Sequence, residues 1–154
     1  MSKIVVEGLD ELIYRMRAFP ERLRKVMEIS MQGTLLKLWE NVPPYPDQDS
    51  RPPTDYTRTG TLGRTLGVSQ DGVRQGQPDI YEVKPSGSGM VEGEFGTNLD
   101  YAPYVIGERE QAWMHQGIWW TIRDVADRAL EGITRLWEIT AEELAKYLDG
   151  KSGQ

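Results

Sequence analysis

The stretch FGTNLDYAPYVIGEREQAWMHQGIWW, residues 95–120, is the part of the chain around which the rest is organised. It contains the aromatic residues Tyr101, Tyr104, Trp113, Trp119 and Trp120 and the only histidine, His115. Glycine and proline residues divide it into short pieces, between a strand expected to enter it at Phe95 and a helix expected to begin near Gly117. Because aromatic side chains each bury a large area, this stretch is predicted to pack against the rest of the domain or against a partner.

A long helix is predicted after this stretch, over residues 117–148. Apolar residues recur there with a period near 3.6, namely Ile118, Ile122, Val125, Ala129, Ile133, Leu136, Trp137, Leu144 and Tyr147. Charged residues fill the opposite side, as expected for a helix that packs against a core on one face.

Two amphipathic helices are predicted near the N-terminus. Residues 9–16 carry leucine, isoleucine and methionine at positions that share one face, and residues 20–42 continue the pattern. Phe19 and Pro20 are expected to separate the two helices, because proline disfavours the helical conformation in the residue before it. Both helices are predicted to pack on the core.

Short strands are predicted between these helical regions. Residues 79–84 alternate and are rich in strand formers, residues 90–96 return after a glycine-rich reversal, and a third strand is expected at 66–69. Val91, Gly93 and Phe95 are expected on one side of their strand. A sheet this small needs helices to cover it. The predicted fold class is therefore α+β, with two N-terminal amphipathic helices, a small antiparallel sheet and a long C-terminal helix.

Residues 43–55, PPYPDQDSRPPTD, are predicted to form a long loop, because proline removes backbone donors and favours extended conformations. Two interpretations are equally favoured: a segment that becomes ordered on a partner, and a solvated connector. The chain of 154 residues fits a single domain over residues 1–149, with residues 150–154 expected to be a disordered tail.

The composition limits the classes of function. A net charge of −6 argues against binding of nucleic acid, which needs a face rich in lysine or arginine. The chain has no cysteine, which excludes disulfides and thiolate metal sites and fits a reducing compartment. No apolar run reaches the roughly 18 residues of a membrane span, and none resembles a signal peptide. The protein is therefore expected to be soluble and made in the cytoplasm.

A catalytic apparatus is not recognisable in the sequence. His115 is a lone histidine among bulky side chains, and such a residue is far more often packed than catalytic. Carboxylate pairs such as Glu92 and Glu94 are present, but an exposed strand surface explains them equally well. The glycine-rich segments lack the lysine and the spacing of phosphate-binding loops. The sequence therefore predicts that the protein is not an enzyme and has no catalytic residues, no metal site and no cofactor.

The adjacent residues Trp119 and Trp120 point to different sides in any regular structure, and two interpretations stay open. One of them could be exposed and anchor an interface, a role that tryptophan fills often. Both could equally be buried between helix and sheet.

Two short motifs resemble those of the minor tail-component family of long-tailed bacteriophages and prophages, also called tail-completion or neck proteins. Residues 58–65, RTGTLGRT, resemble the family's T-G-x-L-x-x-S segment, with Thr59, Gly60 and Leu62 in place and Thr65 where serine is usual. Residues 101–105, YAPYV, followed by Gly107, resemble its Y-A-x-Y-V signature. The family's usual Pro-x-x-x-aromatic continuation is replaced here by residues 111–120. The two N-terminal amphipathic helices, which open with Gly8 and Leu9, also match.

The resemblance implies a structural protein of the virion, placed in the neck between head and tail, with an α+β fold and no enzymatic activity. Its expected partners are further copies of itself in a ring, with a hexamer favoured, and the neighbouring connector and tail-tube proteins. DNA is expected to pass through the ring without specific binding, which the acidic balance would suit. The residues implied in motif or interface roles are Thr59, Gly60, Leu62, Tyr101, Tyr104, Trp113, Trp119 and Trp120.

An alternative from another class is a small phage-encoded hydrolase or host-directed inhibitor that uses carboxylates near His115. Loss of activity on replacing His115 by alanine would distinguish that enzyme from a structural subunit.

Overall fold

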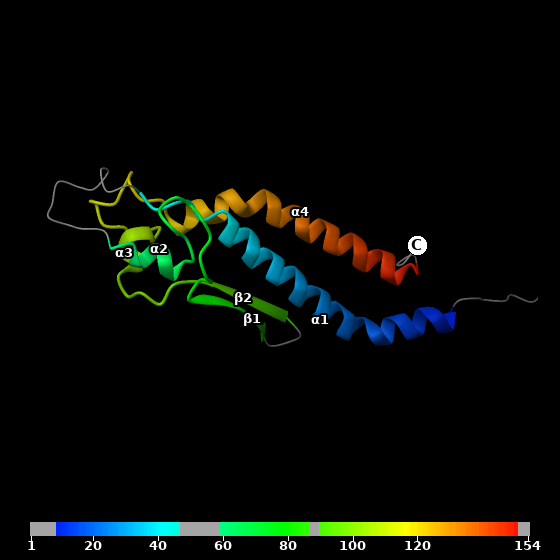
Figure 1. The fold of residues 1–154 in the computed structure, drawn as a ribbon. Coiled ribbons are helices and arrows are strands. Elements are labelled where there is room, and N and C mark those ends of the chain that lie inside the picture. The colour runs from blue at the N-terminus through cyan, green and yellow to red at the C-terminus, as the bar shows by residue number, and fades with distance from the viewer. Residues whose placement is uncertain (1–8, 47–58, 87–89, 151–154) are drawn as a thin grey trace, which may run out of the picture.

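The computed structural model describes residues 9–46, 59–86 and 90–150. Along the chain the elements are α1 (Leu9–Glu40), α2 (Thr61–Thr65), β1 (Ile80–Ser86), β2 (Met90–Gly96), α3 (Ala102–Ile106) and α4 (Ile122–Leu148). The predicted α+β class, the small antiparallel sheet and the long C-terminal helix are confirmed. Helix α1 runs through the middle of the molecule, with α4 on one side of it and the β1–β2 hairpin on the other (Figure 1). The short helices α2 and α3 lie together at one end (Figure 1). Most of the predicted loop, residues 47–55, and residues 151–154 of the predicted tail lie outside the described residues.

The predicted separation of two N-terminal helices at Phe19 and Pro20 is wrong. Helix α1 is continuous over 32 residues and contains Pro20. Proline removes one helical hydrogen bond and crowds the preceding turn, but its fixed φ matches that of a helix. The result is a bend in the N-terminal third of α1 (Figure 1), which is the usual effect of an interior proline. A helix with a proline kink thus takes the place of two helices.

Helices α1 and α4 approach closely because small and polar residues lie between them. A Cβ atom built on Gly33 would lie 2.9 Å from Cδ2 of Leu136, so the backbone of α1 lies directly against that side chain. The buried hydroxyls of Ser30 and Thr140 lie 2.7 Å apart and share a hydrogen bond across the two helices. Farther from the core, the guanidinium carbon of Arg22 lies 4.4 Å from the ring centroid of Tyr147. These contacts define the inner face of α4.

The other side of α1 packs on the hairpin. The predicted side of β2 is confirmed: Val91 is buried, and a Cβ atom on Gly93 would lie 2.8 Å from the Cγ atom of Met31. The register pairs Val83 with Gly93 across the two strands. The absence of a side chain at Gly93 therefore allows α1 to lie close to the sheet.

A third strand at 66–69 is a wrong prediction, because the sheet in the described residues has two strands. Only Val68 forms a bridge there, with Arg74, across a turn at Gly72 whose φ is +81°. The guanidinium of Arg74 donates a hydrogen bond to the carbonyl oxygen of Glu40 at the end of α1. Residues 66–74 therefore form a cap on the C-terminal end of a helix rather than a strand of the sheet.

The long C-terminal helix begins later than predicted. Gly117 has a φ of +74°, outside the helical region, and the helix starts at Ile122 after an N-cap at Thr121. Val125 and Ala129 of α4 are fully or almost fully buried. The apolar periodicity is therefore correct for α4 itself, whereas Ile118 belongs to the turn before it.

Candidate interaction site at the α3 end

The two motifs that carry the family resemblance pack against each other. Leu62 and Leu66, from α2 and the residue after it, form one buried cluster with Ala102, Val105 and Ile106 of α3 and with Trp119. Each of these side chains is at most 7% exposed. Segments separated by about forty positions in the chain thus form a single core, which the tertiary structure brings together.

Steric constraints favour glycine at two positions of the motifs, Gly60 and Gly107. Gly60 is the N-cap residue of α2 and has a φ of +70°, a conformation that side chains disfavour. The amide of Gly107 donates to the carbonyl oxygen of Pro103 at 2.9 Å, and a Cβ atom on Gly107 would lie 2.3 Å from that oxygen. Glycine therefore terminates α3 where any side chain would collide with the last turn.

Thr65, at the position where the motif that it resembles has serine, forms two hydrogen bonds through its hydroxyl. Its Oγ1 donates to the carbonyl oxygen of Leu62 at 3.0 Å and accepts from the hydroxyl of Thr97 at 2.8 Å. These two hydrogen bonds link α2 to the segment that leads to α3, and a serine hydroxyl could make both of them.

Among the predicted interface residues, Leu62 and Trp119 are buried and belong to the core. Trp120 is partly buried, packs against the core, and donates from Nε1 to the carbonyl oxygen of Pro44 at 3.3 Å. Of the two interpretations left open for the tryptophan pair, burial is therefore the closer one. Thr59 is exposed, and its hydroxyl lies 2.8 Å from that of Thr61.

Tyr45 is a part of this region that the sequence did not single out. Its ring stacks on Trp119 with centroids 6.5 Å apart and an angle of 15° between the planes. It lies in the proline-rich segment, where an aromatic residue between two prolines was the available signal. Tyr45 therefore anchors the start of that segment on the core.

Three aromatic residues of the predicted interface set are exposed: Tyr101 by 42%, Tyr104 by 59% and Trp113 by 73%. The amide of Ala112 donates to the carbonyl oxygen of Tyr104 at 2.8 Å, which holds the segment that carries Trp113 beside α3. We refer to Tyr101, Tyr104 and Trp113 as the aromatic surface. Large exposed aromatic side chains of this kind are common anchors of protein interfaces.

His115 is buried, with 5% of its surface exposed. Its carbonyl oxygen accepts hydrogen bonds from the amides of Ile118 and Trp119, which fold residues 112–119 into consecutive turns. The prediction that this histidine is packed is confirmed. Within residues 9–46, 59–86 and 90–150, no group of three or more histidine, cysteine or acidic residues is arranged to hold a metal ion.

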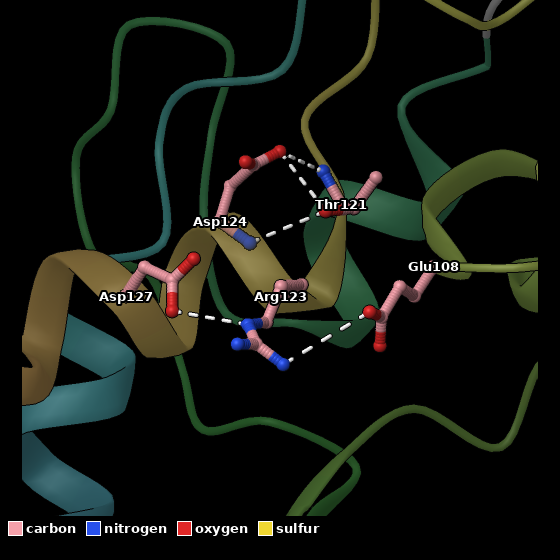
Figure 2. A network of polar contacts seen from close by, with 5 residues as sticks. All are labelled: Glu108, Thr121, Arg123, Asp124 and Asp127. Carbon is pink, nitrogen blue, oxygen red and sulfur yellow. Dashed lines mark hydrogen bonds and ion pairs between the residues drawn. The ribbon is translucent and has the colours of Figure 1, made fainter.

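A polar network joins the turn after α3 to the first turn of α4 (Figure 2). The amide of Thr121 donates to Oδ2 of Asp124 at 2.7 Å, and the amide of Asp124 donates to Oγ1 of Thr121 at 3.2 Å, which makes a capping box. Arg123 lies between two carboxylates, with Nε 3.0 Å from Oδ1 of Asp127 and Nη1 3.9 Å from Oε1 of Glu108. The contact of Arg123 with Glu108 therefore links the turn after α3 to the first turn of α4.

Replacing Thr121 by alanine is expected to lower the free energy of unfolding by about 1 kcal/mol, because an amide at the start of α4 loses its acceptor. Thermal unfolding measures this change. The control is Asp127→Ala, which removes an exposed ion pair and is expected to change stability by less than about 0.5 kcal/mol. Equal losses in the two variants would contradict the assignment of the capping box.

The hydrogen bonds from the backbone and side chain of Thr121 lower the pKa of Asp124. A lowered folded-state pKa stabilises the fold at pH values above the unfolded pKa of about 3.9, and this contribution is lost as pH falls through the folded-state value. The variant Asp124→Asn should therefore be less stable than the parent chain at neutral pH. The difference in stability between the two chains, measured by urea unfolding, should shrink below about pH 4. A difference that stays constant with pH would contradict a stabilising role of the ionised Asp124 carboxylate.

Comparison of the chain with protein-family models, with curated proteins and with solved structures found no match. Within the part of the chain that the structure describes, no helix has both the length and the apolar character that a membrane span requires.

Proposed function

We propose that this chain is a structural protein of the head–tail neck of a long-tailed bacteriophage, acting in tail completion, and that copies of it form a ring around the DNA channel. The observation that supports the proposal most directly is the packing of the two motif segments, residues 59–65 and 101–107, in one core. Two motif segments that act together in one functional unit are expected to lie side by side in the fold, as these do. The steric reasons for glycine at positions 60 and 107 support the same proposal.

The aromatic surface suits the contacts that such a subunit needs. Tyr104 and Trp113 are held by backbone hydrogen bonds on short turns, so little conformational freedom is lost when a partner covers them. The proposed partners are neighbouring copies, in a hexamer by preference, together with the connector and tail-tube proteins of the same phage. In this proposal the protein resides in the virion, has no enzymatic activity and uses no cofactor, and DNA passes through the ring without specific binding.

The direct test is quantitative peptide mass spectrometry on purified virions of the phage that encodes this chain. The expected result is a fixed number of copies per particle, from a few to about a dozen, which a single ring around one channel requires. A chain that is abundant in infected cells but missing from particles would overturn the proposal. It would favour instead the hydrolase or inhibitor alternative.

The double variant Tyr104→Ser with Trp113→Ser is expected to fold normally but to reduce joined, infectious particles by roughly ten-fold or more, because buried aromatic anchors dominate interface energies. Electron microscopy and plaque counts measure the loss. The matched control is Val73→Ser, a change at another exposed apolar residue. Normal particle numbers from the double variant would remove the aromatic surface from the proposed interface.

A further inference from the structure

The face of α4 that points away from α1 is exposed and mainly acidic. Leu136, Trp137, Thr140 and Tyr147 face α1. The opposite side has a shallow hollow. It is lined by the exposed acidic residues Asp127, Glu131, Glu138 and Glu142 and by one cation, Arg135. Leu130 and Ile139 border these carboxylates and are 59% and 50% exposed. We refer to this surface as the outer face of α4.

Most of the carboxylates on this outer face lack a cation. Asp127 pairs with Arg123, but Glu131, Glu138 and Glu142 form no ion pair with any residue that the structure describes. A row of carboxylates, most of them without an ion pair, next to exposed aliphatic side chains is a surface that a basic, partly apolar partner would complement.

The N-terminal part of α1 has this basic and partly apolar character. The contact of Arg22 with Tyr147 lies near the C-terminal end of α4, and the residues of α1 before it add roughly 20 Å of helix. Figure 1 shows this blue end of α1 extending beyond both the hairpin and the last turn of α4. Its exposed charged side chains between Tyr14 and Lys25 are mostly basic: Arg17, Arg22, Arg24 and Lys25, with Glu21 as the exposed acidic residue among them. Tyr14 is 72% exposed.

The two surfaces cannot meet within one chain. The outer face of α4 points away from α1, and the N-terminal part of α1 continues past the end of α4 (Figure 1). They can meet only between copies, and such a contact between different surfaces makes each copy both donor and acceptor. Contacts of that type close into rings when the rotation between copies allows it.

We propose that successive copies of this chain bind head to tail, with the basic N-terminal part of α1 of one copy lying on the acidic outer face of α4 of the next. The inference rests on the proposed function, because it identifies the partner of these surfaces as a second copy in the ring. Arg17 and Lys25, which form no ion pair with described residues, supply the charges for the carboxylates on α4, and Tyr14 covers the aliphatic border.

Charge reversal tests the pairing. The α1 variant carries Arg17→Glu and Lys25→Glu, and the α4 variant carries Glu131→Lys and Glu138→Lys. Each variant by itself places like charges opposite each other at the proposed contact, and is therefore expected to weaken self-association by about ten-fold or more. Sedimentation velocity at an ionic strength of about 0.05 M measures the change. An equimolar mixture of the two variants restores opposite charges at every contact, as does a chain that carries all four changes. Both are expected to associate like the parent chain.

The matched control is Glu82→Lys with Glu92→Lys, which makes the same change in net charge as the α4 variant, at exposed positions of the hairpin. It is expected to leave association unchanged. Self-association that persists in both single-surface variants would overturn the inference, as would loss that the mixture does not restore. Persistent association combined with failure to join tails would assign the outer face to a neighbouring neck protein instead.

A parent chain that remains monomeric at low salt and high concentration would also overturn head-to-tail binding. The proposed function would stand or fall separately, on the copy number of the chain in virions. The two failures are therefore distinguishable.

Discussion

Replacing Trp119 by alanine is expected to lower the free energy of unfolding by about 3–5 kcal/mol, the range typical of large aromatic residues removed from a core. Trp119 is 7% exposed and shares the buried cluster that joins α2 to α3. Its removal also takes away the surface on which the ring of Tyr45 stacks. Both the lost burial and the remaining cavity contribute to the expected loss.

Thermal or urea unfolding measures this loss, and Trp113→Ala is the matched control. Trp113 has the same side chain but is 73% exposed, so its replacement is expected to change stability by less than about 0.5 kcal/mol. Tm should fall by roughly 2–4 °C for each kcal/mol in a domain of this size. Similar melting temperatures for the two variants would contradict the assignment of Trp119 to the core and of Trp113 to the surface.

Replacing Gly63 by alanine is expected to destabilise the fold by about 2 kcal/mol, as overpacking of a tight core typically does. A Cβ atom there would lie 2.5 Å from Cδ1 of Tyr45 and 2.8 Å from the carbonyl oxygen of Val68. The tyrosine ring is stacked on Trp119, and the carbonyl belongs to the backbone, so neither can move without disturbing other contacts. This steric cost exceeds the benefit of about 1 kcal/mol that alanine brings to a helix.

Gly96→Ala is the control for this prediction, since the nearest atom to its added Cβ is Cδ1 of Ile80 at 3.9 Å. It is expected to leave the free energy of unfolding unchanged or to raise it by up to about 1 kcal/mol, because alanine restricts the unfolded chain. If Gly63→Ala were as stable as Gly96→Ala in urea unfolding, the close packing of α2 against Tyr45 would be wrong.

The residues of the candidate site could largely be identified from the sequence, but which of them are exposed could not. The aromatic residues between positions 101 and 120 were identified from composition alone, yet Trp119 is in the core while Trp113 is in solvent. Local pattern does not separate them, because burial depends on which distant segment covers each ring. Here α2 covers Trp119 from more than fifty positions away. The role of Tyr45 was missed for the same reason.

The charge pattern of the two long helices was likewise visible in the sequence, but its position on the folded surface was not. The sequence predicts only that the polar side of α4 faces solvent. Only the position of α1 determines which side of α4 is the inner one. The same packing places the basic end of α1 beyond the last turn of α4 (Figure 1). The complementarity between the two surfaces therefore emerges from the packing of α1 on α4.

By itself, the sequence determined the α+β class, the apolar faces of the long helices and the side of β2 that carries Val91 and Gly93. Each of these follows from local periodicity or from turn residues, which act over a few positions. Tertiary structure decided the rest. Helix α1 continues through Pro20, residues 66–69 close against the end of α1 instead of joining the sheet, and two motif segments share one core. These outcomes depend on burial against distant segments, whose free energy outweighs local preferences of about 1 kcal/mol and which no single stretch of sequence encodes.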